Sequence, residues 1–459
     1  MWKRRTVLVG AAGLLVAALG RFAWTRVFDD DGEEPIRSLW VGAVTPTSVA
    51  ATVCTRDRAE ETLLLASTDA TFPRQVHSLA LMPDAEHFFC RGTLAELLPD
   101  TRYYLGVSVG GRLAAQTVGR FRTPPAGAHG FSFGFASCAE TGSDAAIFDV
   151  IRRKAETGEL DFFVHAGDLH YADIEHNDVG LFHAAYDSVF ASPSQGAAWR
   201  SLPMYYMWDD HDYGPNNSHD GSGGREAALR SYRARVPSPP LAAQGGEDTV
   251  HYSFVRGRVR FVATDLRSGK SDPDMPDGPG KIMLGPEQKA WFRRELQAAR
   301  RAGQVVCWIN THVWLGDADE DSDRWFGYVH ARQEMAEMIA DEAMGRSIFI
   351  IAGDMHALAY DDGSNNAWGG FPVLQAAPLD KRPSQKGGPY LAGPFPPDEE
   401  NDEPISQFAI VSVDDGGKSV LGIRFVGLRV DRDTGAESVL IDETFTRTVP
   451  SDVRSRGRL

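Results

Sequence analysis

The 459-residue sequence has little cysteine and fewer basic than acidic residues. Its four cysteines are too few for a disulfide-held scaffold. Cys54 and Cys90 are near enough in the chain to form one disulfide, whereas Cys307 lies in an apolar run and is expected in a core. With 47 Lys and Arg against 63 Asp and Glu, the net charge is −16, which argues against a nucleic-acid partner. An acidic surface fits either simple solubility or a site that needs cations.

The sequence also lacks a membrane-length apolar run at its start. Residues 6–20 are apolar, too short for a typical span and suited to the core of a signal peptide. Arg4 and Arg5 precede this run, which predicts a twin-arginine export signal in residues 1–28. We therefore expect the protein in the periplasm, outside the cell or at the cell surface. An uncleaved N-terminal membrane anchor is the alternative.

Two regions with different patterning follow this segment. Residues 36–124 contain short apolar runs separated by turn residues, which predicts a β-sandwich. The stretch "LLPDTRYYLGVSV" resembles a fibronectin type III strand with its preceding turn. Residues 130–449 alternate apolar runs with helical segments, such as the helix expected over residues 285–303, and this pattern predicts an α/β domain. Two later runs, "FAIVSVDD" and "VLGIRFVGLRV", predict an antiparallel hairpin that closes the sheet.

Polar residues follow the apolar runs of the second region at the points where strands are expected to end. Open α/β sheets bind ligands at the carboxyl ends of their strands, so these residues predict a metal site. The six ends are Ser137-Cys138, Asp168, Asp209-Asp210-His211, Asp265-Leu266-Arg267, Asn310-Thr311-His312 and Asp354-Met355-His356.

The residue types indicate which chemistry such a site supports. Two neighbouring cations need a shared carboxylate, and Asp168 is the natural bridge. A thiolate from Cys138 and a phenolate from Tyr171 favour iron over Mg²⁺, whereas Asp and Asn oxygens suit Ca²⁺. Two such ions produce hydroxide from water and hold a phosphoryl group for in-line displacement. Arg267 either steadies charge on the phosphoryl oxygens or forms an ion pair with Asp265.

At these residues the sequence resembles the alkaline phosphatase D (PhoD) family of metallophosphoesterases. The resemblance implies an αββα metallophosphatase core and a centre of Fe³⁺ with one or two Ca²⁺, in preference to Zn²⁺ or Mn²⁺. It assigns iron to Cys138, Asp168, Tyr171 and His356, and calcium to Asp168, Asn216 and Asp354, with Asn217 as the alternative to Asn216. The matching stretches are "FASC", "HAGDLHYAD", "MWDDHDYGPNN", "VATDLRSG", "GPEQKAWFRREL", "DRWFGYVHARQEM" and "IAGDMHAL".

Other polar residues of these stretches receive supporting roles. We expect Asp209 and Asp210 to orient the metal ligands without binding a metal ion themselves. His211 either does the same or protonates a leaving group. His312 is an extra ligand or a substrate contact, and His165 and His170 shape the site.

These features predict an exported, metal-dependent alkaline phosphatase and phosphodiesterase that acts on small organic phosphate esters. A phospholipase-type phosphodiesterase of the same family is the alternative. A surface binding protein with a decayed metal site is the alternative of another class, and the intact ligand set counts against it. We expect a monomer with no nucleic-acid-binding surface.

Overall fold

The computed structural model describes residues 34–57, 61–72, 76–84, 86–243, 248–396 and 403–451. The predicted export segment, residues 1–28, lies outside these residues. Within the described part of the chain, no helix combines the length and apolar character needed to cross a membrane.

The first region folds into two antiparallel sheets whose apolar side chains share one core. Val41 and Val53 of one sheet and Leu64 and Leu105 of the other belong to this core. The short apolar runs predicted in this region lie in strands, although a fibronectin type III identity stays a prediction. One sheet contains β1 (Ile36–Thr45), β2 (Ser48–Thr55) and β5 (Phe89–Leu94), and the other contains β3 (Thr62–Ser67), β4 (His77–Leu81), β6 (Arg102–Val109), β7 (Arg112–Leu113) and β8 (Gly119–Arg122).

The four cysteines are free thiols. Strand register explains why Cys54 and Cys90 do not pair. Val53 lies opposite Cys90, and Cys54 lies opposite Phe89. Since neighbouring residues of a strand point to opposite faces, the two thiols point away from each other. Cys307 is buried, as predicted.

The second region contains two larger sheets. The six-stranded sheet has the order β11 (Met204–Met207), β10 (Phe162–Ala166), β9 (Phe131–Ala136), β19 (Ser406–Asp414), β20 (Val420–Val430) and β21 (Glu437–Thr448). The seven-stranded sheet has the order β12 (Tyr252–Arg256), β13 (Val259–Ala263), β14 (Val305–Asn310), β15 (Ile348–Ala352), β17 (Val373–Gln375), β16 (Leu358–Asp361) and β18 (Ala392–Phe395). The predicted hairpin is the antiparallel pair of β19 and β20.

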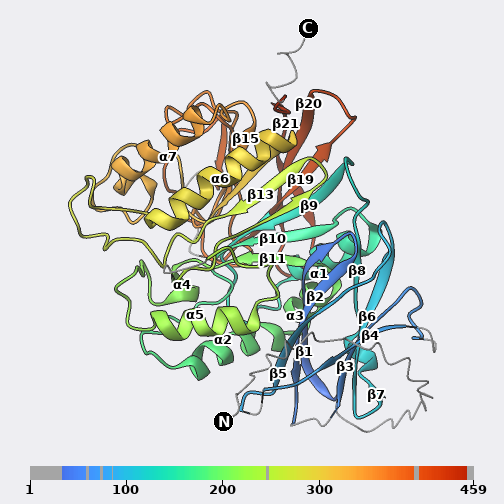
Figure 1. Cartoon of the computed structure of the whole chain (residues 1–459). Coiled ribbons are helices and arrows are strands. Elements are labelled where there is room, and N and C mark those ends of the chain that lie inside the picture. The colour runs from blue at the N-terminus through green and yellow to red at the C-terminus, as the bar shows by residue number, and fades with distance from the viewer. Residues whose placement is uncertain are drawn as a thin grey trace, which may run out of the picture.

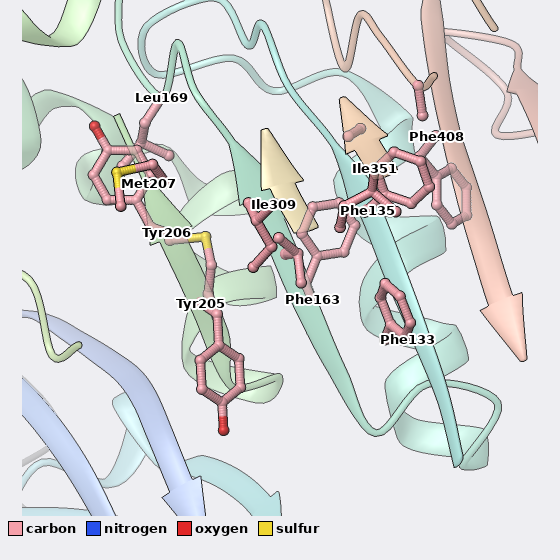
Figure 2. Packing of buried hydrophobic residues seen from close by; sticks show 14 of the residues in the cluster. Phe133, Phe135, Phe163, Leu169, Tyr205, Tyr206, Met207, Ile309, Ile351 and Phe408 are labelled. Carbon is pink, nitrogen blue, oxygen red and sulfur yellow. The ribbon is translucent and has the colours of Figure 1, made fainter. Parts of the chain in front are cut away.

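The two large sheets share an apolar core. Phe133 of β9 lies 5.3 Å from Phe261 of β13, measured between ring centroids. Figure 2 shows this core from close by, with Phe135 on β9 and Ile309 and Ile351 on strands of the seven-stranded sheet. Every residue of β10, β14 and β15 is buried, which is why these runs are mostly apolar rather than alternating; His165 and Asn310 are the polar exceptions.

Helices cover the sheets from outside. Trp199 of α3 packs against Phe163 of β10, and Phe292 of α6 packs against Trp308 of β14. Figure 1 shows α6 and α7 on one side of the sheets and α2 and α5 on another. The predicted helix over 285–303 is α6, which ends at Gly303 in the left-handed conformation. The helices are α1 (Ala146–Thr157), α2 (Val179–Ala191), α3 (Pro193–Ser201), α4 (Asp210–Tyr213), α5 (Arg225–Arg235), α6 (Pro286–Ala302) and α7 (Val329–Asp341), with 3₁₀ turns η1 (Ala115–Thr117) and η2 (Trp325–Gly327).

Parallel pairing aligns the strand ends that carry the predicted ligands. Strands β9, β10 and β11 run parallel in one sheet, and β13, β14 and β15 run parallel in the other. Their carboxyl ends therefore meet at common edges, as predicted.

Candidate metal centre

Residues from three strand ends surround one point. Cys138 follows β9, Asp168 follows β10 and His356 follows β15, and one ligand atom of each lies within 4.8 Å of the others. The hydroxyl of Tyr171 is 2.9 Å from Asp168 Oδ2 and 3.3 Å from His356 Nε2. The structure thus gathers the four residues predicted to bind iron, and their role as ligands stays a prediction.

The ring of His356 is oriented to offer Nε2 to this point. Its Nδ1 lies 2.7 Å from the carbonyl oxygen of Arg382, which only accepts hydrogen bonds, so Nδ1 carries the hydrogen. Burial, and then the charge of Lys386, lowers the pKa of His356 to about 4. The ring is therefore neutral near pH 7, with a free electron pair on Nε2, as metal-binding histidines require.

The backbone at the centre turns sharply. Cys138, Asp168, Asp354 and His356 have φ angles of 62°, 54°, 65° and 57°, in the left-handed region that residues with side chains rarely adopt. Each such residue costs about 1–3 kcal/mol, and such residues cluster at functional sites. The buried strands before each turn hold the chain in this conformation.

A second group of side chains that could hold an ion shares Asp168. One atom each of Asp168, Asp210 and His211 lies within 4.8 Å of the others. Nδ1 of His211 lies 2.5 Å from Asp173 Oδ1, and its ring centre is 4.2 Å from that of Tyr171. Asp173 thereby fixes the ring and leaves Nε2 for the site. The group includes Asp210, for which the sequence predicted only an orienting role.

The residues present fit metal ions. Asp168 Oδ1 is buried and has no hydrogen-bond partner among the described residues. Burial, and then repulsion from Asp210, Asp209 and Asp212, raises the pKa of Asp168 well above its usual value. A carboxylate shared by two ligand groups and surrounded by like charges is stabilised by cations. The thiol, phenol and imidazole beside it suit a transition metal, and the carboxylates suit a harder ion.

The other two predicted calcium ligands lie differently. Asn216 is exposed, and its neighbour Asn217 anchors the loop through its backbone amide, 2.8 Å from Asp210 Oδ2. The carboxylate of Asp354 is paired with Arg324 and Lys386. Calcium binding by Asn216 and Asp354 stays a prediction.

Asp212 fixes the turn that carries Asp168. Its Oδ2 accepts hydrogen bonds from the amides of Asp168 at 2.6 Å and Asp209 at 3.0 Å. Its Oδ1 accepts from the amides of Leu169 at 2.8 Å and His170 at 3.1 Å. Asp212 therefore joins the turn after β10 to the start of α4, and so joins the two ligand groups.

Arg267 lies in a buried ion-pair network. Its Nε donates to Asp209 Oδ1 at 2.7 Å, and Nη2 lies 3.4 Å from Asp210 Oδ1. The ion pair with Asp265 that the sequence left open is instead made with Asp209, and Asp265 accepts the backbone amide of Arg267 at 3.1 Å. The side chain is 1% exposed, so Arg267 holds Asp209 and Asp210 in place. Its direct contact with substrate stays a prediction.

His312 is part of the same network. Its Nδ1 is 3.3 Å from Arg267 Nη2, and its Nε2 is 3.3 Å from Lys270 Nζ. Lys270 also lies 3.4 Å from Asp323, and burial, followed by the charge of Arg267, lowers the pKa of Lys270 to about 8. Both ring nitrogens of His312 thus face neighbouring side chains rather than open space.

His165 and His170 are fully buried among aromatic rings. The ring of His165 lies 5.9 Å from that of Tyr206, and the ring of His170 lies 5.5 Å from that of Tyr186. Their predicted role of shaping the site stays a prediction.

A groove of about 660 Å³ adjoins the centre. Tyr171, one of the predicted metal ligands, and Asp173, which contacts His211, are among its lining residues. Ile174, Leu181 and Ala184 give it an apolar wall. The groove is therefore large enough for an organic group attached to a phosphate at the centre.

The site gathers side chains that fit metal ions, and the comparisons assign the family. Residues 133–370 match the family model described as PhoD-like phosphatase, so the chain belongs to the PhoD-like phosphatases, and the predicted resemblance is confirmed. Membership makes the protein a phosphoric ester hydrolase and implies metal ions at its site.

Solved structures are similar to the chain as well. A structure titled "Structure of PhoD" matches with a TM-score of 0.67 and 17% identity, over 90% of this chain and 94% of that one, which shows a shared fold. A dimetal phosphatase from Danio rerio matches with a TM-score of 0.39 and 15% identity, over 70% of this chain and 99% of that one. A search of curated proteins found no match.

Sequence reasoning assigned no role to three charged residues at the site, Asp212, Arg324 and Lys386. Asp212 lies within "MWDDHDYGPNN" and Arg324 within "DRWFGYVHARQEM", so both stretches carried a signal. Lys386 lies in a polar loop, and no pattern marks it. Its position at the site depends on how that loop packs.

Proposed function

We propose that the protein is an exported alkaline phosphatase and phosphodiesterase that contains iron and calcium and hydrolyses small organic phosphate esters. The observation that carries this proposal is the convergence of Cys138, Asp168, Tyr171 and His356 at one point. When bound, the ions supply Lewis acidity and activate a water molecule for attack on phosphorus. Twin-arginine export, a monomeric state, a fibronectin III-like first domain and an αββα arrangement of the second belong to the same proposal.

The protein's own residues divide the work between them. Asp168 lies in both ligand groups and is proposed to bridge the two ions. Asp173 orients His211. His211 is proposed to stay off the metal ions, and its ring, when protonated on both nitrogens, to give the departing alkoxide the proton of Nε2. Arg267 keeps Asp209 and Asp210 in position from behind the site. The groove beside Tyr171 is proposed to receive the organic part of the ester.

The test is hydrolysis of a phosphomonoester and a phosphodiester by protein purified with its native metals. We expect turnover of both esters and loss of this turnover when calcium is chelated. The circular dichroism spectrum should stay unchanged on chelation, because the apolar core keeps the protein folded without metal. Absence of turnover by metal-loaded protein would contradict the proposal and favour a binding protein. A faster rate on phosphatidylcholine than on small esters would assign the protein to the phospholipase alternative.

A further inference from the structure

Two cationic side chains flank Asp354 at the edge of the metal centre. Arg324 Nε lies 2.5 Å from Asp354 Oδ2, and Arg324 Nη2 lies 3.2 Å from Asp354 Oδ1. Lys386 Nζ lies 2.9 Å from Asp354 Oδ1 and 2.9 Å from the Asp354 carbonyl oxygen. The side chains of Arg324 and Lys386 are 18% and 24% exposed, so both are largely enclosed and still reach solvent.

These cations are connected to the ligands of the centre. The amide of Asp354 donates to Ser137 Oγ at 3.2 Å, and Ser137 Oγ lies 3.0 Å from Cys138 Sγ. An unbroken series of short contacts therefore runs from Lys386 to Cys138. His356, one of the residues predicted to bind iron, lies two residues after Asp354 in the chain.

Arg324 and Lys386 together carry two positive charges against the one negative charge of Asp354. They also have more N–H donors than their contacts with Asp354 occupy. A guanidinium has five N–H donors and an ammonium has three. The contacts with Asp354 occupy two donors on each cation, and Arg324 Nη1 also lies 3.0 Å from Asp323 Oδ1. Asp323 is itself shared with Arg267 and Lys270. Among the residues that the structure describes, Arg324 and Lys386 thus share one carboxylate that has no other cationic partner, that of Asp354, and N–H donors remain for an anion.

We propose that Arg324 and Lys386 bind the non-bridging oxygens of the substrate's phosphoryl group and favour phosphomonoesters over diesters. In this structure Asp354 holds both cationic groups in position. A monoester carries up to two negative charges on the phosphoryl oxygens and a diester carries one. Charge-assisted hydrogen bonds to the extra charge therefore select the monoester. This inference rests on the proposed function, because it names the preferred substrate class of that site.

The experiment compares Lys386→Gln and Arg324→Gln with the unmodified protein on p-nitrophenyl phosphate and bis-p-nitrophenyl phosphate. We expect kcat/KM for the monoester to fall about ten- to a hundredfold and that for the diester to change less than about threefold. Lys386→Arg, which keeps the charge, should retain most of the monoester preference. Lys289→Gln is the matched control, because Lys289 Nζ lies 2.8 Å from Glu334 and its side chain is likewise 24% exposed. Equal losses on both esters, or no loss, would overturn the inference.

Two measurements that do not depend on turnover complete the test. Calorimetric titration of metal-loaded protein with inorganic phosphate should show weaker binding in both Gln variants and unchanged binding in the control. Unchanged phosphate affinity in the Gln variants, or loss of metal together with activity, would overturn the inference. If the unmodified protein cleaves neither ester while the Gln variants still bind phosphate more weakly, the proposed function fails and the anion site stands.

Discussion

At the scale of the residue, Asp212 shows how a side chain that is not a predicted ligand controls the site. Its carboxylate accepts four backbone amides, three of them from the turn that carries Asp168. Without these acceptors the turn loses the contacts that balance its strained backbone. Partners behind metal ligands typically contribute ten- to a hundredfold to metal affinity.

We therefore predict that Asp212→Ala weakens metal binding by about ten- to a hundredfold, measured by titration of the apo protein. Asp178→Ala is the control, because Asp178 also accepts a backbone amide, that of Gly180 at 2.8 Å, but at the start of α2. That control should cost about 1 kcal/mol of stability and leave metal binding unchanged. Equal metal affinity in Asp212→Ala and the unmodified protein would show that the turn keeps its conformation without the Asp212 carboxylate.

His211 is predicted to act on the leaving group. A good leaving group departs without a proton, whereas a poor one needs the acid. His211→Asn should therefore lower kcat about a hundredfold or more on an alkyl phosphate and much less on p-nitrophenyl phosphate. Metal content serves as the control, because a loss of metal would make His211 a ligand instead. The same fall on both substrates with full metal content would exclude its role as an acid.

At the scale of the element, the turn from β10 into the site requires glycine. Gly167 has φ of 98°, and a Cβ there would lie 2.4 Å from Asp209 Cβ. Gly167→Ala is therefore strained and also pushes the turn after β10 away from the start of α4.

We predict that Gly167→Ala lowers stability by about 2 kcal/mol or more and reduces metal content, measured by chemical denaturation and elemental analysis. Gly127→Ala is the matched control, since Gly127 has φ of 79° but a Cβ there would meet no heavy atom of the described residues within 4 Å. That control should cost about 1 kcal/mol and keep its metals. Indistinguishable stability in the two variants would mean that the contact with Asp209 is easily relieved.

The elements near the site could be predicted because burial leaves a clear pattern. β10, β14 and β15 are mostly apolar, and polar residues lie at or just after their carboxyl ends. The edge strand β21, "ESVLIDETFTRT", has mostly exposed residues and therefore lacks that pattern. The cations Arg324 and Lys386 come from segments outside the helices and strands, whose packing is set by tertiary contacts that no local pattern encodes.

At the scale of the whole molecule, buried histidines make stability depend on pH. His251 is 2% exposed and packs 4.3 Å from Trp291, measured between ring centroids. Burial lowers the pKa of His251 to about 4 from its usual value of 6.5. In the unfolded chain the ring takes up a proton as the pH falls below 6.5, while the folded protein keeps it neutral. Its contribution to stability is therefore complete above pH 6.5 and is lost as the pH falls towards 4.

We predict that His251→Gln reduces the acid-induced loss of stability between pH 6.5 and 4 by on the order of 2 kcal/mol, measured by urea denaturation across that range. His330→Gln, at an exposed position of α7, is the control and should leave the pH dependence unchanged. An identical pH dependence in His251→Gln and the unmodified protein would refute this assignment.

The central claim is that one aspartate joins two ion sites at the meeting point of the strand ends. Elemental analysis of the natively produced protein and of Asp168→Ala tests it most directly. We predict that iron and calcium are both present in the unmodified protein and both absent from the folded variant, which also has no phosphatase activity. A folded Asp168→Ala protein that retains both metals would contradict the claim.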